Sequence, residues 1–190
     1  MQALTRKFLS FSVSRDLAHR WNTYQARLKS VSPEKDAAPA LESFLDALTQ
    51  GSDSPDRKAS KVLRNPAEVC DGLLSAVSHL VPSPEASELL CKVLSAIDLL
   101  STEFWGFFDQ RALVAQLTSV LEVVADSAAR TFSLHILKRL TLNGECSQAK
   151  SQALKELLAL TLSMDLALAK AAAQTLGEVF EQQPSQEQDP

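Results

Sequence analysis

The chain has 190 residues, of which 45% are apolar and 22% are charged, a composition typical of a folded globular domain. A domain of this size buries enough surface to fold without a disulfide or a structural metal. No apolar run of about 18 residues occurs, so no membrane-spanning helix is predicted. The formal net charge of −4 and the pI of about 5.4 argue against nucleic acid as the main ligand.

Two helices are predicted near the N-terminus. The first is expected to begin at Ser14, which can cap it, and to run to about Ser30, because apolar residues recur at steps of three and four. The second is expected over residues 38–50, and Gly51 then stops it. The stretch before Ser14 is rich in Arg, Lys and Ser without an acid, which fits either an amphipathic helix or a mitochondrial transit peptide.

Residues 51–58 are the clearest predicted loop, since they hold turn formers and no large apolar residue. A short helical piece is expected around residues 57–64. The loop divides the chain into basic N-terminal helices over 1–65, which we expect to pack on the rest, and a helical domain over 66–183. The polar tail over 184–190 is expected to be disordered.

From Pro66 onward the apolar pattern predicts nearly continuous helix with regular breaks. The expected helices span 66–80, 84 to about 100, 110–125, 127–143, 147–164 and 165–182, with Ser83 and Asp126 as N-caps. Glycine is scarce, and strands need it at their turns. The fold class is therefore predicted to be all-α.

Three of these helices carry matching apolar positions. The helix with Leu89 aligns with the one carrying Phe132 at an offset of 43, and the last helix, with Ala171, follows at an offset of 39. This pattern resembles HEAT and armadillo repeats, whose helix pairs recur at roughly 40–47 residues. The resemblance implies stacked antiparallel helix pairs, a short α-solenoid whose grooved surface binds a protein or peptide. A closed helical bundle is the alternative architecture.

An aromatic cluster follows the predicted helix that ends near Leu100. Phe104, Trp105, Phe107 and Phe108 lie within five residues, so they cannot all face inward from one helix. Exposed members would form a contact site for a protein partner. Packing between neighbouring helix pairs is the alternative interpretation.

Positive charge is concentrated in residues 1–65, which hold 11 Lys and Arg against 7 Asp and Glu, while the remainder holds 8 against 16. Arg15, Arg20 and Arg27 lie along the first predicted helix. They are predicted to contact an acidic protein partner or, alternatively, the acidic remainder of the same chain. Nucleic acid is the less favoured partner.

The sequence has three cysteines that lie far apart and form no CxxC pair: Cys70, Cys91 and Cys146. We expect them to be small buried apolar residues, which suits a reducing cytoplasmic or nuclear compartment. Leu154–Leu158 matches an LxxLL box, a helical docking motif, but this pattern arises readily in a leucine-rich helix and is interpreted as core. The acids Glu85 and Glu88 are explained by their place in the first turn of a helix.

No catalytic or metal-binding constellation is recognisable. The three histidines lie apart from one another, and phosphate-binding glycine motifs and a nucleophile elbow are lacking. We therefore expect a non-catalytic scaffold or adaptor that needs no cofactor and no metal. The alternatives are an enzyme whose groups converge only in space and a mitochondrial or membrane-surface protein.

Overall fold

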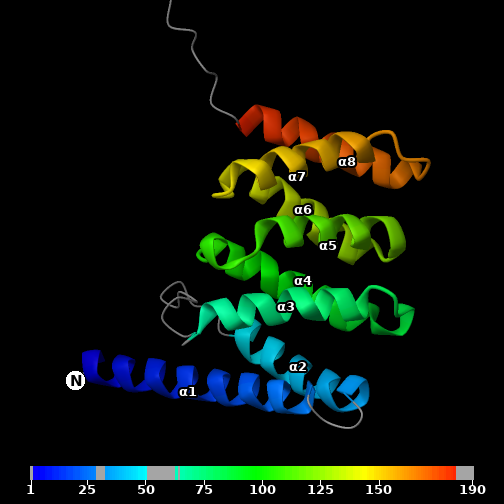
Figure 1. Cartoon of the computed structure of the whole chain (residues 1–190). Helices are drawn as coiled ribbons and strands as arrows, with labels where there is room; N and C mark the ends of the chain where they lie inside the picture. The colour runs from blue at the N-terminus through cyan, green and yellow to red at the C-terminus, as the bar shows by residue number, and fades with distance from the viewer. Residues whose placement is uncertain (1, 29–32, 51–62, 64, 183–190) are drawn as a thin grey trace, which may run out of the picture.

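The computed structural model describes residues 2–28, 33–50, 63 and 65–182, and within them it contains eight α-helices and no strand (Figure 1). The helices are α1 (Gln2–Leu28), α2 (Pro33–Gln50), α3 (Pro66–Leu80), α4 (Ser87–Ser101), α5 (Gln110–Val123), α6 (Ser127–Asn143), α7 (Ser147–Leu160) and α8 (Leu166–Gln182). Short 3-10 turns, Pro84–Ala86 and Trp105–Phe107, lie before α4 and α5. The all-α prediction is confirmed for these residues.

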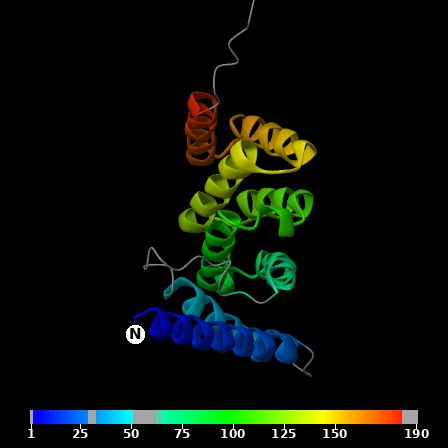
Figure 2. The same cartoon turned by 90° about the vertical axis from the view of Figure 1, so that its left-hand side faces the viewer.

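The helices form a stack of hairpins with two layers. Consecutive helices pair as α1 with α2, α3 with α4, α5 with α6 and α7 with α8. Along the stack, α3, α5 and α7 pack on one another in one layer, and α2, α4, α6 and α8 in the other. Figure 2 shows the layers from the side, with α1 and α2 at one end and α7 and α8 at the other. The predicted stack of helix pairs is therefore confirmed, and the closed bundle is not observed among the described helices.

The two N-terminal helices are longer than predicted. α1 begins at Gln2 rather than at Ser14, because the chain contains no proline or glycine before Pro33 to interrupt a helix. α2 begins at Pro33 and continues through Pro39, which removes one backbone hydrogen bond. The helix survives this loss because the apolar residues that follow, Leu41, Phe44, Leu45 and Leu48, are buried in the core.

Aspartates cap the starts of three later helices: Asp109 for α5, Asp126 for α6 and Asp165 for α8. The Asp126 carboxylate accepts a hydrogen bond from the backbone N–H of Ala129 at 2.9 Å, which confirms the predicted cap of α6. Asp165 does the same for α8, accepting from Ala167 and Leu168 at 3.0 and 3.1 Å. These bonds satisfy backbone donors that have no partner inside the helix.

Ser83 is at the predicted N-cap position, directly before Pro84, but its side chain makes no capping hydrogen bond. Prolines on both sides of Ser83 restrict the backbone, and the chain makes a 3-10 turn before α4 begins at Ser87. Two other helices are shorter than predicted, since α5 ends at Val123 and α7 at Leu160.

Ion pairs connect successive helices of the layer formed by α2, α4, α6 and α8. The pairs are Lys92 with Glu42 and Asp46, Arg139 with Asp98, and Lys138 with Glu178. The sequence predicted that cations of the N-terminal helices contact acids in the rest of the chain. In the ion pairs between α2 and α4 the charges are the other way round, because α4 supplies the cation and α2 the acids. These partly exposed pairs contribute mainly to alignment, since exposed ion pairs add little stability.

One hydrophobic core runs from Leu17 in α1 to Val179 in α8. It continues across the boundary predicted at residue 65, so α1 and α2 share the core of the later helices. The segments predicted as a loop, a short helix and a tail, 51–58, 57–64 and 184–190, lie almost entirely outside the described residues. None of the described helices is long and apolar enough to cross a membrane.

Candidate functional site

The aromatic cluster lies in the connection between α4 and α5. Phe104, Trp105 and Phe108 are buried, whereas Phe107 is 46% exposed. The Phe104 and Phe107 rings lie edge to face, with centroids 5.8 Å apart. Three of the four aromatics therefore belong to the core, which agrees with the alternative interpretation that they pack inside the protein. Being buried, these three offer no surface to a partner. The predicted partner contact stays a prediction for Phe107 alone.

A buried glutamine that the sequence did not single out holds this connection in place. The Gln110 side-chain amide donates to the Trp105 carbonyl at 3.0 Å, and its oxygen accepts from the backbone N–H groups of Glu145 and Cys146 at 3.1 and 3.0 Å. Gly144 allows this approach, because a Cβ there would lie 2.5 Å from the Leu140 carbonyl oxygen and 3.1 Å from the Gln110 side-chain oxygen. One amide thus joins the aromatic connection to the α6–α7 turn.

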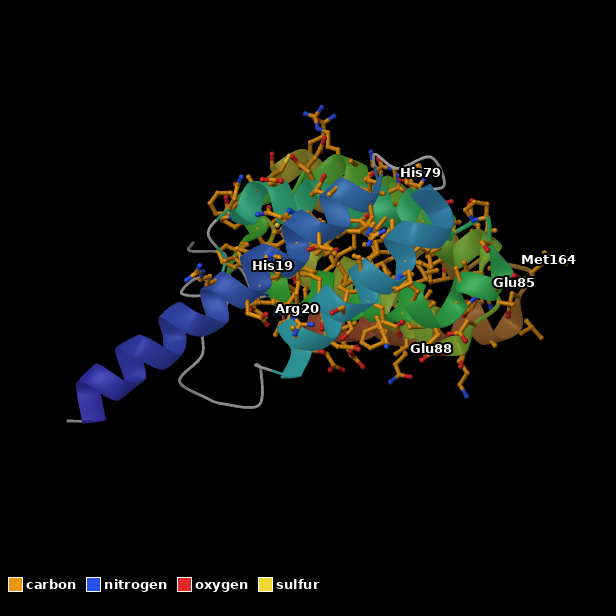
Figure 3. All side chains as sticks on the ribbon, turned by 90° about the horizontal axis from the view of Figure 1, so that it is seen from below. His19, Arg20, His79, Glu85, Glu88 and Met164 are labelled. Atoms are coloured by element: carbon orange, nitrogen blue, oxygen red, sulfur yellow. The ribbon has the colours of Figure 1, made fainter. Side chains whose placement is uncertain are left out.

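The three arginines predicted along the first helix have different surroundings. Arg20 forms an ion pair with Asp16 at 2.9 Å and donates to the Ser43 hydroxyl of α2. Arg15 and Arg27 are exposed. Figure 3 places Arg20 where α1 lies over α2, while the first half of α1 extends beyond the other helices. The predicted contact with an acidic partner therefore stays a prediction that depends on Arg15 and Arg27.

The most exposed large apolar side chains lie in the hairpin of α7 and α8. Within the described residues, this hairpin carries five of the seven large hydrophobic side chains that are exposed: Leu158, Leu162, Met164, Leu166 and Phe180. In the turn itself Leu162 is 86% exposed and Met164 is 97% exposed. Figure 3 shows Met164 projecting from the margin of the molecule. We call Leu158, Leu162 and Met164 the turn patch.

The turn patch is not predicted from the sequence, because the predicted helix continues to Met164 and leaves no turn at Leu162. The LxxLL interpretation as core holds for Leu157, which is fully buried, but Leu158 is exposed. A Ser-Met-Asp stretch at 163–165, between two amphipathic helices, was the available sign of a turn.

The histidines remain separate in the structure. His19 and His79 are exposed on different helices, and His135 Nδ1 lies 3.2 Å from the Asp98 carboxylate. Glu85 and Glu88 are exposed near the start of α4. Among the residues that the structure describes, no group of three or more His, Cys, Asp and Glu side chains is placed to hold a metal ion.

The three cysteines are free thiols with different environments. Burial raises the pKa of Cys70 to about 12. Burial, together with a hydrogen bond to Asp126, raises the pKa of Cys91 to about 11. The pKa of Cys146 is lowered, because the thiol lies at the start of α7 near the backbone N–H of Ala149 and also near Arg111. A helix N-terminus and a cation both favour the thiolate.

We expect Cys146 to be the first cysteine alkylated by iodoacetamide in the native protein at neutral pH. The thiolate is the reactive form, and each pKa unit changes its fraction about tenfold. Mass-spectrometric peptide mapping over time measures the three rates. Arg111→Ala should slow the reaction at Cys146 and leave the other two sites unchanged. Faster labelling of Cys70 or Cys91 would contradict the expectation.

Comparisons of the chain with known protein families, with curated proteins and with solved structures found no match.

Proposed function

We propose that the protein is a non-catalytic scaffold that binds another protein or a peptide through the turn patch. The observation that carries this proposal is the exposure of Leu162 and Met164 in one turn. Single exposed apolar residues are common on protein surfaces, but neighbouring ones in a turn are a feature of binding sites. Methionine suits such a surface because its flexible side chain adapts to different partners.

The patch is presented by a fixed turn. The Asp165 carboxylate caps α8 and also accepts a hydrogen bond from Arg130 of α6 at 2.6 Å. The pKa of Asp165 is lowered by the Leu168 backbone N–H and by Arg130, so the carboxylate stays charged at neutral pH. A partner that buries Leu162 and Met164 therefore spends little free energy on ordering the turn.

The resemblance to HEAT and armadillo repeats also supports a binding role, since stacked helix pairs commonly carry protein ligands, although that step is an analogy from fold. The free cysteines concern the location only, and they suit the reducing cytoplasm or nucleus that we propose for the protein. An acidic protein that contacts Arg15 and Arg27 is a second candidate partner, supported by their exposure on α1.

Quantitative affinity capture from cells tests the proposal. We expect the double variant Leu162→Ser, Met164→Ser to lose at least one protein that the wild type retains, by roughly tenfold or more, because burying one such side chain contributes about 1.5–3 kcal/mol. Val123→Ser, a matched change at an exposed apolar residue at the end of α5, should retain it. Equal capture by all three proteins, each with wild-type thermal stability, would overturn the proposal.

A further inference from the structure

The outward face of α8 carries two large apolar side chains that are open to solvent. Leu166 is 82% exposed and Phe180 is 54% exposed. Between them Ala173 and Gly177 are exposed, and a Cβ added at Gly177 would meet nothing within 4 Å. Steps of seven, four and three residues place all four on one face of the helix. The opposite face of α8, with Leu168, Ala172 and Val179, is buried, and the helix packs on α6 and α7 (Figures 1 and 2).

The residues of this face are arranged symmetrically about Ala173. Leu166 and Phe180 each lie seven residues away from it, and the small residues Ala169 and Gly177 each lie four residues away. In an antiparallel pair of α8 helices with a two-fold axis at Ala173, Leu166 of each copy meets Phe180 of the other. The small residues then face one another at the centre and let the helix axes approach to about 8 Å.

The charged residues at the edge of this face also fit an antiparallel pair of α8 helices. Lys170 and Glu181 are both exposed and lie on the same edge of α8, three residues before and eight residues after Ala173. Helical side chains lean toward the N-terminus of their own helix, so in an antiparallel pair Lys170 leans toward Glu181 of the second copy. The two-fold axis creates this pair twice.

We propose that the protein forms a two-fold symmetric dimer in which α8 packs antiparallel against α8 of a second copy, with Ala173 at the axis. The apolar contacts are Leu166 with Phe180 of the other copy, and the paired charges are Lys170 with Glu181 of the other copy. This interface does not include the turn patch. The proposal therefore goes beyond the proposed function and does not depend on it.

Sedimentation velocity of the full-length chain tests the dimer. At high concentration the sedimentation of the wild type is expected to correspond to a dimer, with twice the 20.7 kDa mass of the chain. On dilution the dimer is expected to dissociate. Ala173→Glu places two carboxylates at the axis and should weaken association by roughly tenfold or more. Ala115→Glu, the same change at an exposed residue of α5, should leave the dimer intact. A wild type that is monomeric at every concentration, or an Ala173→Glu variant that dimerises like the wild type, would overturn the proposal.

Charge reversal tests the antiparallel pairing. Lys170→Glu and Glu181→Lys should each weaken the dimer by a few fold, and the combined variant should recover the wild-type affinity, since both pairs re-form with opposite polarity. Failure to recover would exclude the proposed pairing.

Oxidative cross-linking gives a readout that does not depend on affinity. Ala173→Cys is expected to form a covalent dimer readily, because the two cysteines face each other at the axis. Ala167→Cys, with the same native cysteines present, should not. Circular dichroism checks that each variant is folded, and equal cross-linking of both variants counts against the proposal.

Discussion

Replacing Trp21 with alanine is expected to lower the free energy of unfolding by about 3–5 kcal/mol, the usual cost of removing a buried tryptophan. The indole is 4% exposed and packs against Tyr24 and Phe44, with ring centroids 5.2 and 5.0 Å apart. Its N–H donates to the Glu68 carboxylate of α3 at 3.3 Å. Trp21 thus connects α1 to both α2 and α3, and its loss leaves a cavity where the N-terminal helices meet the stack.

Urea denaturation followed by circular dichroism measures this loss, since Trp21 itself cannot then serve as a fluorescent probe. Asn22→Ala, a change at the exposed neighbour on the same helix, is the matched control and should shift stability by less than about 0.5 kcal/mol. A Trp21→Ala protein as stable as the control would contradict the packing of α1 on α3.

Gly72 provides a double-mutant test of the same contact. A Cβ at Gly72 would lie 2.4 Å from the Trp21 ring, and the packed indole has little room to move. Gly72→Ala should therefore cost about 1–3 kcal/mol in the wild type, as overpacking does. In the Trp21→Ala background the clash is gone, and the same change should stabilise α3 by about 0.5–1 kcal/mol, because alanine favours helix. The sign should reverse between the two backgrounds.

Much of the fold was predictable because local patterns and the core agree. The apolar steps of α4, α6 and α8 indicated which residues face inward, and the Asp126 cap was read correctly because its bond is local. Helix ends were less predictable. Leu162 and Met164, which follow α7, fit a continuation of its apolar stripe, and the polar residues Ser163 and Asp165 are only a weak sign that the chain turns there.

The candidate site was predictable only in part, because exposure depends on tertiary packing. Four neighbouring aromatics indicated that something unusual occurs between α4 and α5, but their burial depends on elements distant in sequence. Gln110 gave no signal at all, since its partners at Glu145 and Cys146 lie 35 and 36 residues away. The exposure of Leu166 and Phe180 likewise follows from which face of α8 the stack leaves uncovered.

Gln110→Leu is expected to destabilise the protein by about 2–4 kcal/mol, although it replaces a polar side chain in the core with an apolar one of similar size. The change leaves the Trp105 carbonyl and the N–H groups of Glu145 and Cys146 without their partner, and each unsatisfied buried group costs about 1–3 kcal/mol. Because water has partial access to the α6–α7 turn, the expected loss of stability is smaller than the sum of the costs of the three unsatisfied groups. Denaturation with urea, followed by circular dichroism, measures the change.

Two controls separate this network from a general effect of substitution. Gln148→Leu, the same change at an exposed residue of α7, should leave stability within about 0.5 kcal/mol of the wild type. Gln110→Glu keeps an accepting oxygen but buries a carboxylate and sets one of its oxygens against the Trp105 carbonyl, so at neutral pH it should cost at least as much as Gln110→Leu. Hydrogen exchange adds a local readout, because the amides of Glu145 and Cys146 should exchange faster in Gln110→Leu. Unchanged exchange at both amides would show that Gln110 does not hold the turn, and any loss of stability would then need another cause.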